Sequence, residues 1–185
     1  MQEASYYTRQ GEKILCELCP QGCRLEEGQE GICGVRRVEA GRLVTSNYGF
    51  CASLALDPLD PLDPIEKKPL YHFYPGWEIL SLGTTGCNLH CSFCQNWSLA
   101  RDKIGERMEA ITPTELLAVL RRQPARGQLG VAYTYNEPTV WYEFVRAAAE
   151  LMAENGYRNV LVTNGLIKAQ PLGELLPFVQ ALNVD

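Results

Sequence analysis

Histidine is scarce in this chain, with only two among 185 residues. Histidine is the commonest general base near neutral pH and a member of the Ser-His-Asp triad. Few residues of this chain could therefore serve as the base in such a hydrolysis. A phosphate-cradling glycine-rich loop is also lacking, since Gly83-Thr-Thr-Gly86 is too short and leads into cysteines. The sequence therefore argues against a histidine-dependent hydrolase and against a P-loop protein.

Long apolar segments are absent too. No run approaches the ~18 residues that span a bilayer, and the beginning, Met-Gln-Glu-Ala-Ser, lacks the basic and apolar parts of a signal peptide. The net charge of −5 is unlike the basic surfaces that bind nucleic acids. The pairs Arg36-Arg37, Lys67-Lys68 and Arg121-Arg122 are isolated, so we expect them on solvated faces. We predict a cytoplasmic protein with neither a membrane nor a nucleic acid as partner.

Two regions differ in composition. Residues 1–78 are rich in cysteine, glycine and proline, with one strand-like stretch over 42–56, whereas residues 79–185 alternate apolar runs with amphipathic helical patterns. Between them the tripeptide Leu-Asp-Pro occurs three times within 56–64, and proline at every third position excludes a helix. We predict a small cysteine-rich N-terminal region over 1–78, a surface loop, and a βα region over 79–185.

The second region predicts alternating strands and helices. Strands are expected at 78–83, 130–135 and 159–163, and helices after a Thr112 N-cap, over 138–154, and around 172–182, with 183–185 opening a fourth strand. Pro177 must kink the third helix or mark a later start. The order indicates an α/β fold with a parallel sheet. Half of a barrel and a three- or four-stranded open sheet fit this count equally well.

Eight cysteines are the most informative part of the composition. Because the cytosol is reducing, cysteines there are more often metal ligands or reactive thiols than members of disulfides. Cys87, Cys91 and Cys94 form the run C-x3-C-x2-C directly after the first expected strand. Three thiolates are one fewer than a closed zinc or iron–sulfur site takes. A three-cysteine iron–sulfur cluster with one open iron is favoured over zinc completed by His90, Cys51 or a distant ligand, and over buried unligated thiols.

This loop resembles the signature of radical S-adenosylmethionine (SAM) enzymes, with Phe93 as the aromatic residue before the last cysteine. The resemblance implies that Cys87, Cys91 and Cys94 hold a [4Fe–4S] cluster whose fourth iron is chelated by the methionine part of SAM. It also implies reductive cleavage of SAM to a 5′-deoxyadenosyl radical that abstracts hydrogen from a substrate, with Phe93 packed near the adenine.

Two further segments support the resemblance. Tyr135-Asn136-Glu137-Pro138 stands where the superfamily has a Gly-Gly-Glu-Pro-like motif, which implies that Glu137, with Asn136, receives the methionine amino group. The glycines of that motif are absent here, and by itself Asn136-Glu137-Pro138 equally marks a helix start. Thr163 and Asn164 follow the third expected strand, where the superfamily often places polar side chains near the cofactor. All of these sites follow parallel strands at the edge where barrel enzymes carry their chemistry.

The chain resembles more closely the AmmeMemoRadiSam-system radical SAM enzymes, which are relatives of the pyruvate formate-lyase activating enzymes. The segments that carry this resemblance are Cys16-x2-Cys19-Pro-x2-Cys23, Gly28-x2-Gly31-Ile-Cys33-Gly-Val-Arg36, 65–76, Gln95-Asn96-Trp97 and 134–139. It implies a (βα)6 partial TIM-type barrel of which this chain is the N-terminal half, behind a small cysteine-rich region. It also implies an unknown substrate such as a glycyl-radical-type protein, and an electron donor such as flavodoxin or ferredoxin.

Members of that group are much longer than this chain. We therefore expect a truncated or split member whose barrel a second polypeptide completes. The competing interpretation is a non-catalytic zinc or iron–sulfur protein, derived from a truncated radical SAM enzyme, that serves as a scaffold or electron carrier.

The N-terminal cysteines form a second candidate metal site. Cys16, Cys19, Cys23 and Cys33 supply four thiolates with the spacing C-x2-C-x3-C-x9-C, which suffices to close a site. Structural zinc, an auxiliary iron–sulfur cluster and the absence of metal all remain open from the spacing. Cys51 lies in a strand-like stretch and is expected to be a buried apolar thiol.

Overall fold

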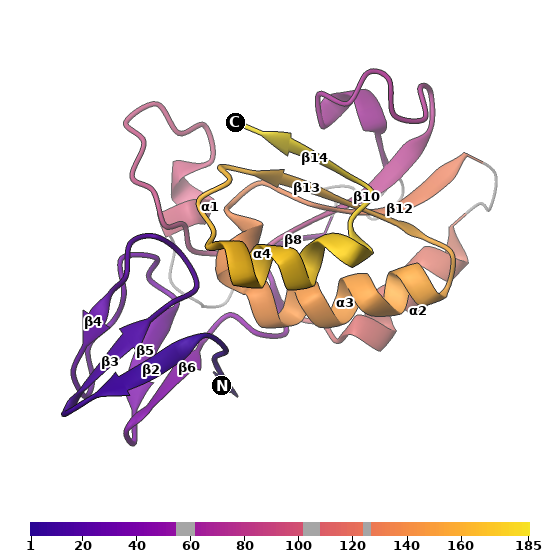
Figure 1. The fold of residues 1–185 in the computed structure, drawn as a ribbon. Helices are drawn as coiled ribbons and strands as arrows, with labels where there is room; N and C mark the ends of the chain where they lie inside the picture. The colour runs from indigo at the N-terminus through magenta and orange to yellow at the C-terminus, as the bar shows by residue number, and fades with distance from the viewer. Residues whose placement is uncertain (55–61, 102–107, 124–126) are drawn as a thin grey trace.

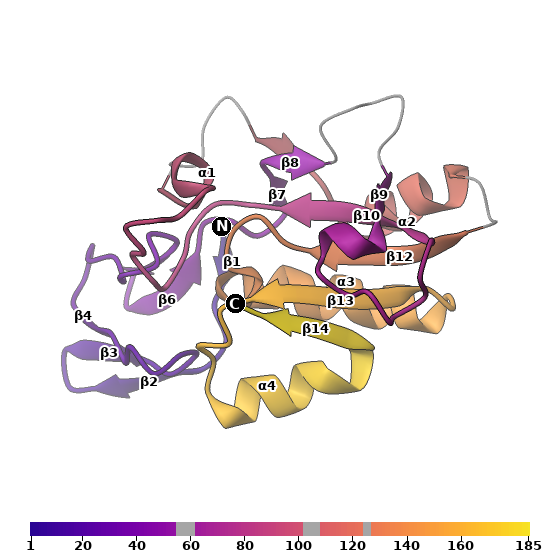
Figure 2. The same cartoon turned by 90° about the horizontal axis from the view of Figure 1, so that it is seen from above.

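A six-stranded sheet organises the chain (Figures 1 and 2). The computed structural model describes residues 1–54, 62–101, 108–123 and 127–185. Across the sheet the strands are β14 (Ala181–Val184), β13 (Arg158–Thr163), β12 (Gln128–Tyr133), β10 (Glu78–Gly83) and β8 (Ser53–Leu54), with β9 (Leu62–Pro64) also beside β10. The strands β10, β12, β13 and β14 are parallel, whereas β8 and β9 run antiparallel to β10. The mixed α/β class is confirmed, and the half-barrel stays a prediction.

The second strand of the parallel series ends earlier than its sequence pattern indicates. It was expected at 130–135, but β12 covers Gln128–Tyr133. Tyr135 has a φ of 73°, in the left-handed region that bulky residues rarely adopt, so the extended backbone cannot continue through it. This bend turns the following Asn136 and Glu137 away from the strand direction and toward the neighbouring loops.

Three α-helices and two 3₁₀ turns lie on one face of the sheet (Figure 1). They are α2 (Pro113–Arg122), the 3₁₀ turn η2 (Pro138–Trp141), α3 (Tyr142–Glu154), α4 (Ala169–Leu175) and the 3₁₀ turn η3 (Leu176–Phe178). Thr112 is the N-cap of α2, as predicted, and forms a capping box with Glu115. The third helix is shorter than the apolar spacing indicates, because Pro177 ends the α-helix and leaves Leu182 in β14.

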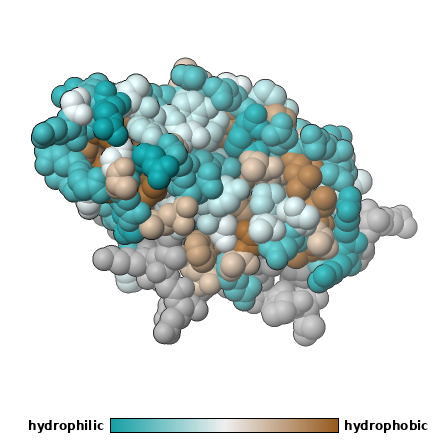
Figure 3. Space-filling view, turned by 90° about the horizontal axis from the view of Figure 1, so that it is seen from below, coloured by the Kyte–Doolittle hydropathy of each residue, from teal (hydrophilic) through white to brown (hydrophobic). Residues whose placement is uncertain are grey.

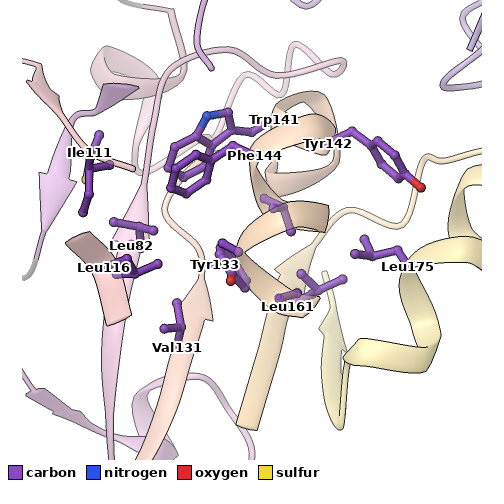
Figure 4. Close-up of a cluster of buried hydrophobic side chains, with 14 of the residues drawn as sticks. Leu82, Ile111, Leu116, Val131, Tyr133, Trp141, Tyr142, Phe144, Leu161 and Leu175 are labelled. Carbon is purple, nitrogen blue, oxygen red and sulfur yellow. The ribbon is translucent and has the colours of Figure 1, made fainter. Parts of the chain in front are cut away.

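The main hydrophobic core fills the space between this face and the helices (Figure 4). Trp141 stacks on Phe144 with ring centroids 4.1 Å apart and planes inclined by 7°. Around them lie Leu82, Ile111, Leu116, Val131, Tyr133, Tyr142, Leu161 and Leu175. Truncating an aromatic residue in such a core costs about 3–5 kcal/mol of folding free energy. This packing fixes the strand ends, and the loops that follow them, relative to the helices.

A smaller core covers the opposite face of the sheet. Ile65, in the 3₁₀ turn η1 (Ile65–Lys67), packs with Ile79, Ala132 and Val160. The strands β8 and β9, and this turn, lie before residue 79, yet all of them join the sheet through β10 or this core. The predicted division at 78/79 stays a prediction, but strand pairing crosses it. Of the Leu-Asp-Pro repeats, 55–61 lies outside the described residues and Leu62–Pro64 is β9.

The N-terminal region is made of short strands in two small antiparallel sheets. One contains β1 (Gln2–Glu3), β6 (Arg42–Thr45) and β5 (Arg36–Glu39), and the other β2 (Tyr7–Gln10), β3 (Lys13–Cys16) and β4 (Arg24–Leu25). The sequence indicated only the stretch 42–56, which is split into β6, β7 (Phe50–Cys51) and β8. Cys51 is buried, as predicted. The strand β7 pairs with β11 (Glu109–Ala110).

The surface is largely hydrophilic where the N-terminal sheets and the helical side are in view, and hydrophobic residues form separate small areas there (Figure 3). In the parts of the chain that the structure describes, no helix is both long enough and apolar enough to cross a membrane.

Candidate functional site

The cysteine loop leaves the end of β10 through a tightly packed turn. Thr84 and Thr85 are buried, and Gly86 has a φ of 95°. A Cβ atom on Gly86 would lie 2.7 Å from Val35 Cγ1 and 2.8 Å from the carbonyl oxygen of Cys33. Glycine is therefore required here both for its backbone conformation and for the close approach of the N-terminal region. The loop then continues to the exposed short helix α1 (Trp97–Arg101).

Asn136 holds the segment that leads into the first cysteine. Its Oδ1 accepts a hydrogen bond from the Thr84 backbone N–H at 3.1 Å. Its Nδ2 donates to the carbonyl oxygens of Thr85 at 3.3 Å and Gly86 at 2.9 Å. Both ends of the amide are thus engaged with the loop. Predicted as a cofactor-binding residue, Asn136 lies in the structure as the side chain that positions the approach to Cys87.

Asn164 holds the next part of the same loop. Its Nδ2 donates to Asn88 Oδ1 at 2.9 Å and lies 3.8 Å from Cys87 Sγ. Asn88 in turn donates from Nδ2 to the Leu166 carbonyl oxygen at 2.8 Å, and Gln21 Nε2 donates to the Asn88 carbonyl oxygen at 2.8 Å. Neither Asn88 nor Gln21 belongs to a motif that indicated a role at the site. The only signal for Asn88 was its position directly after Cys87.

Glu137 joins the two strand ends on either side of it. Its buried carboxylate accepts hydrogen bonds at Oε1 from the Thr163 hydroxyl at 2.7 Å and from the Thr139 backbone N–H at 2.9 Å. Oε2 accepts the Asn164 backbone N–H at 2.8 Å. A carboxylate offers about four acceptor positions, so these bonds leave one on Oε2. Glu137 therefore links the ends of β12 and β13, and its Oε2 can accept one more hydrogen bond.

The three thiols of the loop differ in their surroundings. Cys87 is half-buried, and burial raises the pKa of its thiol, against the Leu89 backbone N–H that donates to Sγ at 3.4 Å. Cys91 is exposed and Cys94 half-buried. Phe93 is 87% exposed, so its ring contacts little of the protein. Within the described ranges, no three His, Cys, Asp or Glu side chains already stand around a common metal position.

A cluster of polar side chains around Asp63, on the face of the sheet opposite the helices, supports the bend after β12. Asp63 accepts hydrogen bonds at Oδ2 from Lys68 Nζ at 2.9 Å, Ser81 Oγ at 2.6 Å and Tyr135 Oη at 3.3 Å. Burial alone would raise the pKa of Asp63, but the hydrogen bonds from Lys68 and Ser81 outweigh it and hold the pKa well below its usual value. Burial lowers the pKa of Lys68, and Asp63 opposes that shift.

The expectation that Arg36 and Lys68 lie on solvated faces was wrong. Arg36 is 1% exposed and Lys68 is 4% exposed. Each has a carboxylate partner, Glu143 for Arg36 and Asp63 for Lys68, which makes burial of the positive charge tolerable. Arg121 and Arg122, by contrast, are exposed as expected.

Comparison with known proteins decides the family. The family model of the radical SAM superfamily matches residues 81–184, more than half of the chain. The chain belongs to the radical SAM superfamily. It is also 42% identical over 189 residues to the uncharacterized protein MJ0808 of Methanocaldococcus jannaschii, a match that includes the whole of this chain and 53% of that protein. The chain thus spans about half the length of the curated relative that it matches.

A radical SAM domain generally carries a [4Fe–4S] cluster and SAM, and the donor set of the loop fits such a cluster. Cys87, Cys91 and Cys94 supply soft thiol ligands within eight residues, at the C-terminal end of a parallel strand. The N–H groups of Leu89 and Asn164 approach the sulfur of Cys87. Such N–H groups around the sulfur ligands are a normal part of the setting of an iron–sulfur cluster.

The N-terminal cysteines lie directly beside this radical SAM loop. Cys33 lines a cavity of about 190 Å³ together with Cys87 and His90, and its carbonyl oxygen accepts the Cys87 backbone N–H at 3.3 Å. On its other side Cys33 lines a second cavity with the remaining predicted ligands, Cys16, Cys19 and Cys23. The structure thus brings together the four cysteines that the spacing grouped.

Proposed function

We propose that this chain is the N-terminal half of a radical SAM enzyme of the pyruvate formate-lyase activating-enzyme-like group. The observation that supports it most is the position of the cysteine loop in a chain of this superfamily. The loop leaves β10, and side chains from the ends of β12 and β13, Asn136 and Asn164, hold it on both sides of Cys87. Chemistry at the carboxyl ends of parallel strands is the usual arrangement in barrel enzymes.

In this proposal Cys87, Cys91 and Cys94 bind the [4Fe–4S] cluster. When bound and reduced by a one-electron donor such as flavodoxin or ferredoxin, the cluster would supply the electron that cleaves SAM to methionine and a 5′-deoxyadenosyl radical, which takes a hydrogen atom from the substrate. The protein contributes ligation, orientation and exclusion of water.

The chain's own residues have separate tasks in this proposal. Glu137 has one free acceptor position on Oε2 for the methionine amino group, and its remaining bonds to Thr163 and Asn164 keep that position fixed. Asn136 and Asn164 keep the loop in place. The exposed ring of Phe93 is available to pack against the adenine. Preorganisation of this kind is what a cofactor enzyme adds to the chemistry of its cofactor.

The substrate and the partners belong to the proposal as well. We propose a substrate such as a glycyl-radical-type protein, which the resemblance to the activating enzymes favours. Further strands beside β14, from a second polypeptide or from additional chain, would complete the barrel. Strand β14 is the last in the order of the sheet, and its outer edge can pair with another strand.

Anaerobic reconstitution tests the proposal. The purified chain is loaded with iron and sulfide, and iron content, visible absorption and release of 5′-deoxyadenosine after dithionite and SAM are measured. We expect Cys87→Ala, Cys91→Ala and Cys94→Ala each to lose four irons per chain and the release of 5′-deoxyadenosine. Cys51→Ala, a buried cysteine outside the loop, serves as the matched control and should keep both.

A protein that stays colourless and binds zinc alone would contradict the proposal and favour the non-catalytic scaffold. So would a cluster whose electron paramagnetic resonance signal does not change when SAM is added, because an open iron is the property on which the chemistry depends. If the chain alone binds the cluster but releases no 5′-deoxyadenosine, the experiment is repeated with a chain of the length of the relative. If that longer chain also releases no 5′-deoxyadenosine, the proposed activity is wrong.

A further inference from the structure

Four cysteines converge on one cavity in the N-terminal region. Cys16 ends β3, and its N–H donates to the carbonyl oxygen of Cys23 at 2.9 Å, which closes the loop that carries Cys19 between them. A second turn brings Cys33 to the same cavity, since the Gly34 N–H donates to the Gly31 carbonyl oxygen at 2.9 Å. The lining of the cavity includes Cys16, Cys19, Cys23, Cys33, Leu18, Leu25 and Arg36.

The two turns are already in contact at this cavity. A Cβ atom on Gly31 would lie 3.5 Å from Cys23 Sγ, so the backbone of the second turn packs directly against a thiol of the first. Cys16 and Cys19 are buried, and Cys23 and Cys33 are half-buried. The spacing C-x2-C followed by two further cysteines is typical of closed tetrathiolate sites.

A buried arginine faces the same cavity with an unused donor. Arg36 is 1% exposed, its Nη1 donates to the Ser5 carbonyl oxygen at 2.9 Å, and its Nη2 donates to Glu143 Oε1 at 2.5 Å. Its Nε, however, has no hydrogen-bond partner. A buried donor without a partner costs about 1–3 kcal/mol, and an ionised thiol in the cavity that Arg36 lines would supply the missing acceptor.

We propose that Cys16, Cys19, Cys23 and Cys33 hold one Zn²⁺ ion in a closed tetrathiolate site, with Arg36 beside it. One Zn²⁺ and four thiolates leave two negative charges, of which the Arg36 guanidinium, also paired with Glu143, offsets a part while its Nε donates to a ligand sulfur. This site is separate from the loop of Cys87, Cys91 and Cys94, and the inference does not depend on the proposed function.

A single ion needs less rearrangement at this cavity than an auxiliary iron–sulfur cluster. The cavity has room for about one water molecule. A cubane would bring four irons and four sulfides between two turns that are already in contact. Zinc at about 2.3 Å from each sulfur requires only that the thiols turn toward a common point. In the described part of the chain the thiols do not yet stand in that arrangement, so binding must rotate them.

The position of this site gives it a structural task. Cys33 and Gln21 hydrogen-bond to the backbone of the radical SAM loop at Cys87 and Asn88, and both belong to the two turns that the ion would join. A closed zinc site contributes directly to folding, and the small sheets here have little core of their own. Bound zinc would therefore hold the N-terminal region in the shape that supports the loop of the iron–sulfur cluster.

Metal analysis of the whole chain tests the inference. In a variant that combines Cys87→Ala, Cys91→Ala and Cys94→Ala, the chain expressed with zinc should retain one zinc per chain and lose it when Cys19→Ser or Cys33→Ser is added. Cys51→Ala added to the same background should keep the zinc. Binding of iron with sulfide at Cys16, Cys19, Cys23 and Cys33 in that background, or retention of no metal at all, would overturn the inference.

Two further measurements keep the test decisive if a cysteine variant fails to fold. Co²⁺ titrated into the metal-free triple-alanine variant should give the absorption of a tetrahedral tetrathiolate site at one equivalent, and any other ligand field contradicts the inference. Arg36→Gln should weaken zinc binding about 10- to 100-fold in competition with a chelator. Glu143→Gln breaks the same ion pair but leaves the guanidinium, so it should weaken zinc binding less, and an equal loss would argue against a role of Arg36 at the metal.

Discussion

Arg36 and Glu143 form an ion pair that joins the N-terminal region to helix α3, with Nη2 2.5 Å from Oε1. Their side chains are only 1% and 8% exposed, and Oε1 of Glu143 also accepts the Ser5 backbone N–H at 2.7 Å. The partners are 107 residues apart in the sequence. The placement of the small N-terminal sheets against the helices therefore depends on a polar contact as well as on apolar packing.

Removing one member of this pair should be strongly destabilising. Glu143→Ala leaves the Arg36 charge buried without a partner, and we expect it to lower the free energy of unfolding by about 3–5 kcal/mol. Urea denaturation measures this loss. Glu150→Ala removes the carboxylate of the more exposed pair between Arg146 and Glu150 and is the control, with an expected change of about 0.5 kcal/mol or less. Equal effects of the two variants would contradict the structural role of the buried pair.

The turn before the cysteine loop should tolerate no side chain. Gly86→Ala introduces a Cβ at 2.7 Å from Val35 Cγ1 on a backbone with φ at 95°. Gly76→Ala is the matched control, because Gly76 has φ at 77° but no atom within 4 Å of the added Cβ. Both variants acquire a backbone strain of about 1–2 kcal/mol, so any larger loss for Gly86→Ala measures the clash. Thermal unfolding gives the comparison, and identical stabilities would show that the N-terminal region can move away.

The amide of Asn164 should influence the redox behaviour of a cluster held by Cys87. An N–H group that points toward a ligand sulfur stabilises the more negative, reduced state, so Asn164→Ala should make the reduction potential of the reconstituted cluster more negative. Asn155→Ala, at the exposed end of α3, is the control. A redox titration followed by electron paramagnetic resonance measures the potential, and no difference between the variants would exclude this contact as a determinant.

Acid should weaken the polar group around Asp63. Its pKa is held below the usual value near 3.9, so the unfolded chain takes up the proton first, and the stabilisation is complete above about pH 5 and is lost as the pH falls below about 4. Asp63→Asn should remove this part of the pH dependence. At neutral pH it should also cost about 1–3 kcal/mol, because Lys68 loses its charged partner. Urea denaturation at several pH values measures both, and an unchanged acid profile would contradict the assignment.

The parts of the fold that depend on residues close together in the sequence could be predicted from it. The strand at Glu78–Gly83 matches its apolar run, and the capping box of Thr112 and Glu115 forms as its spacing indicates. The strands β1 to β5 escaped prediction because two to four residues are too few for a period of two to be recognised.

The cysteine spacing of the candidate site is readable from the sequence, but the contacts around it are not. The spacing of Cys87, Cys91 and Cys94 is a local signal. That Asn136 and Asn164 hold this loop, by contrast, depends on the alignment of three strands that are far apart in the sequence. The burial of Arg36 could not be predicted for the same reason, because a sequence alone does not show that Glu143 lies beside it in the fold.

The left-handed backbone of Tyr135 makes the two faces of the sheet dependent on each other. Its hydroxyl bonds to Asp63 and its ring lies 5.5 Å from the Lys68 ammonium on one face, while the next residue, Asn136, holds the cysteine loop at the strand end. A conformation of this kind costs about 1–3 kcal/mol unless its surroundings maintain it. The contacts of Tyr135 with Asp63 and Lys68 therefore maintain the backbone from which Asn136 reaches the cysteine loop. The geometry of the first cysteine thus depends on residues of the sheet face that it does not touch.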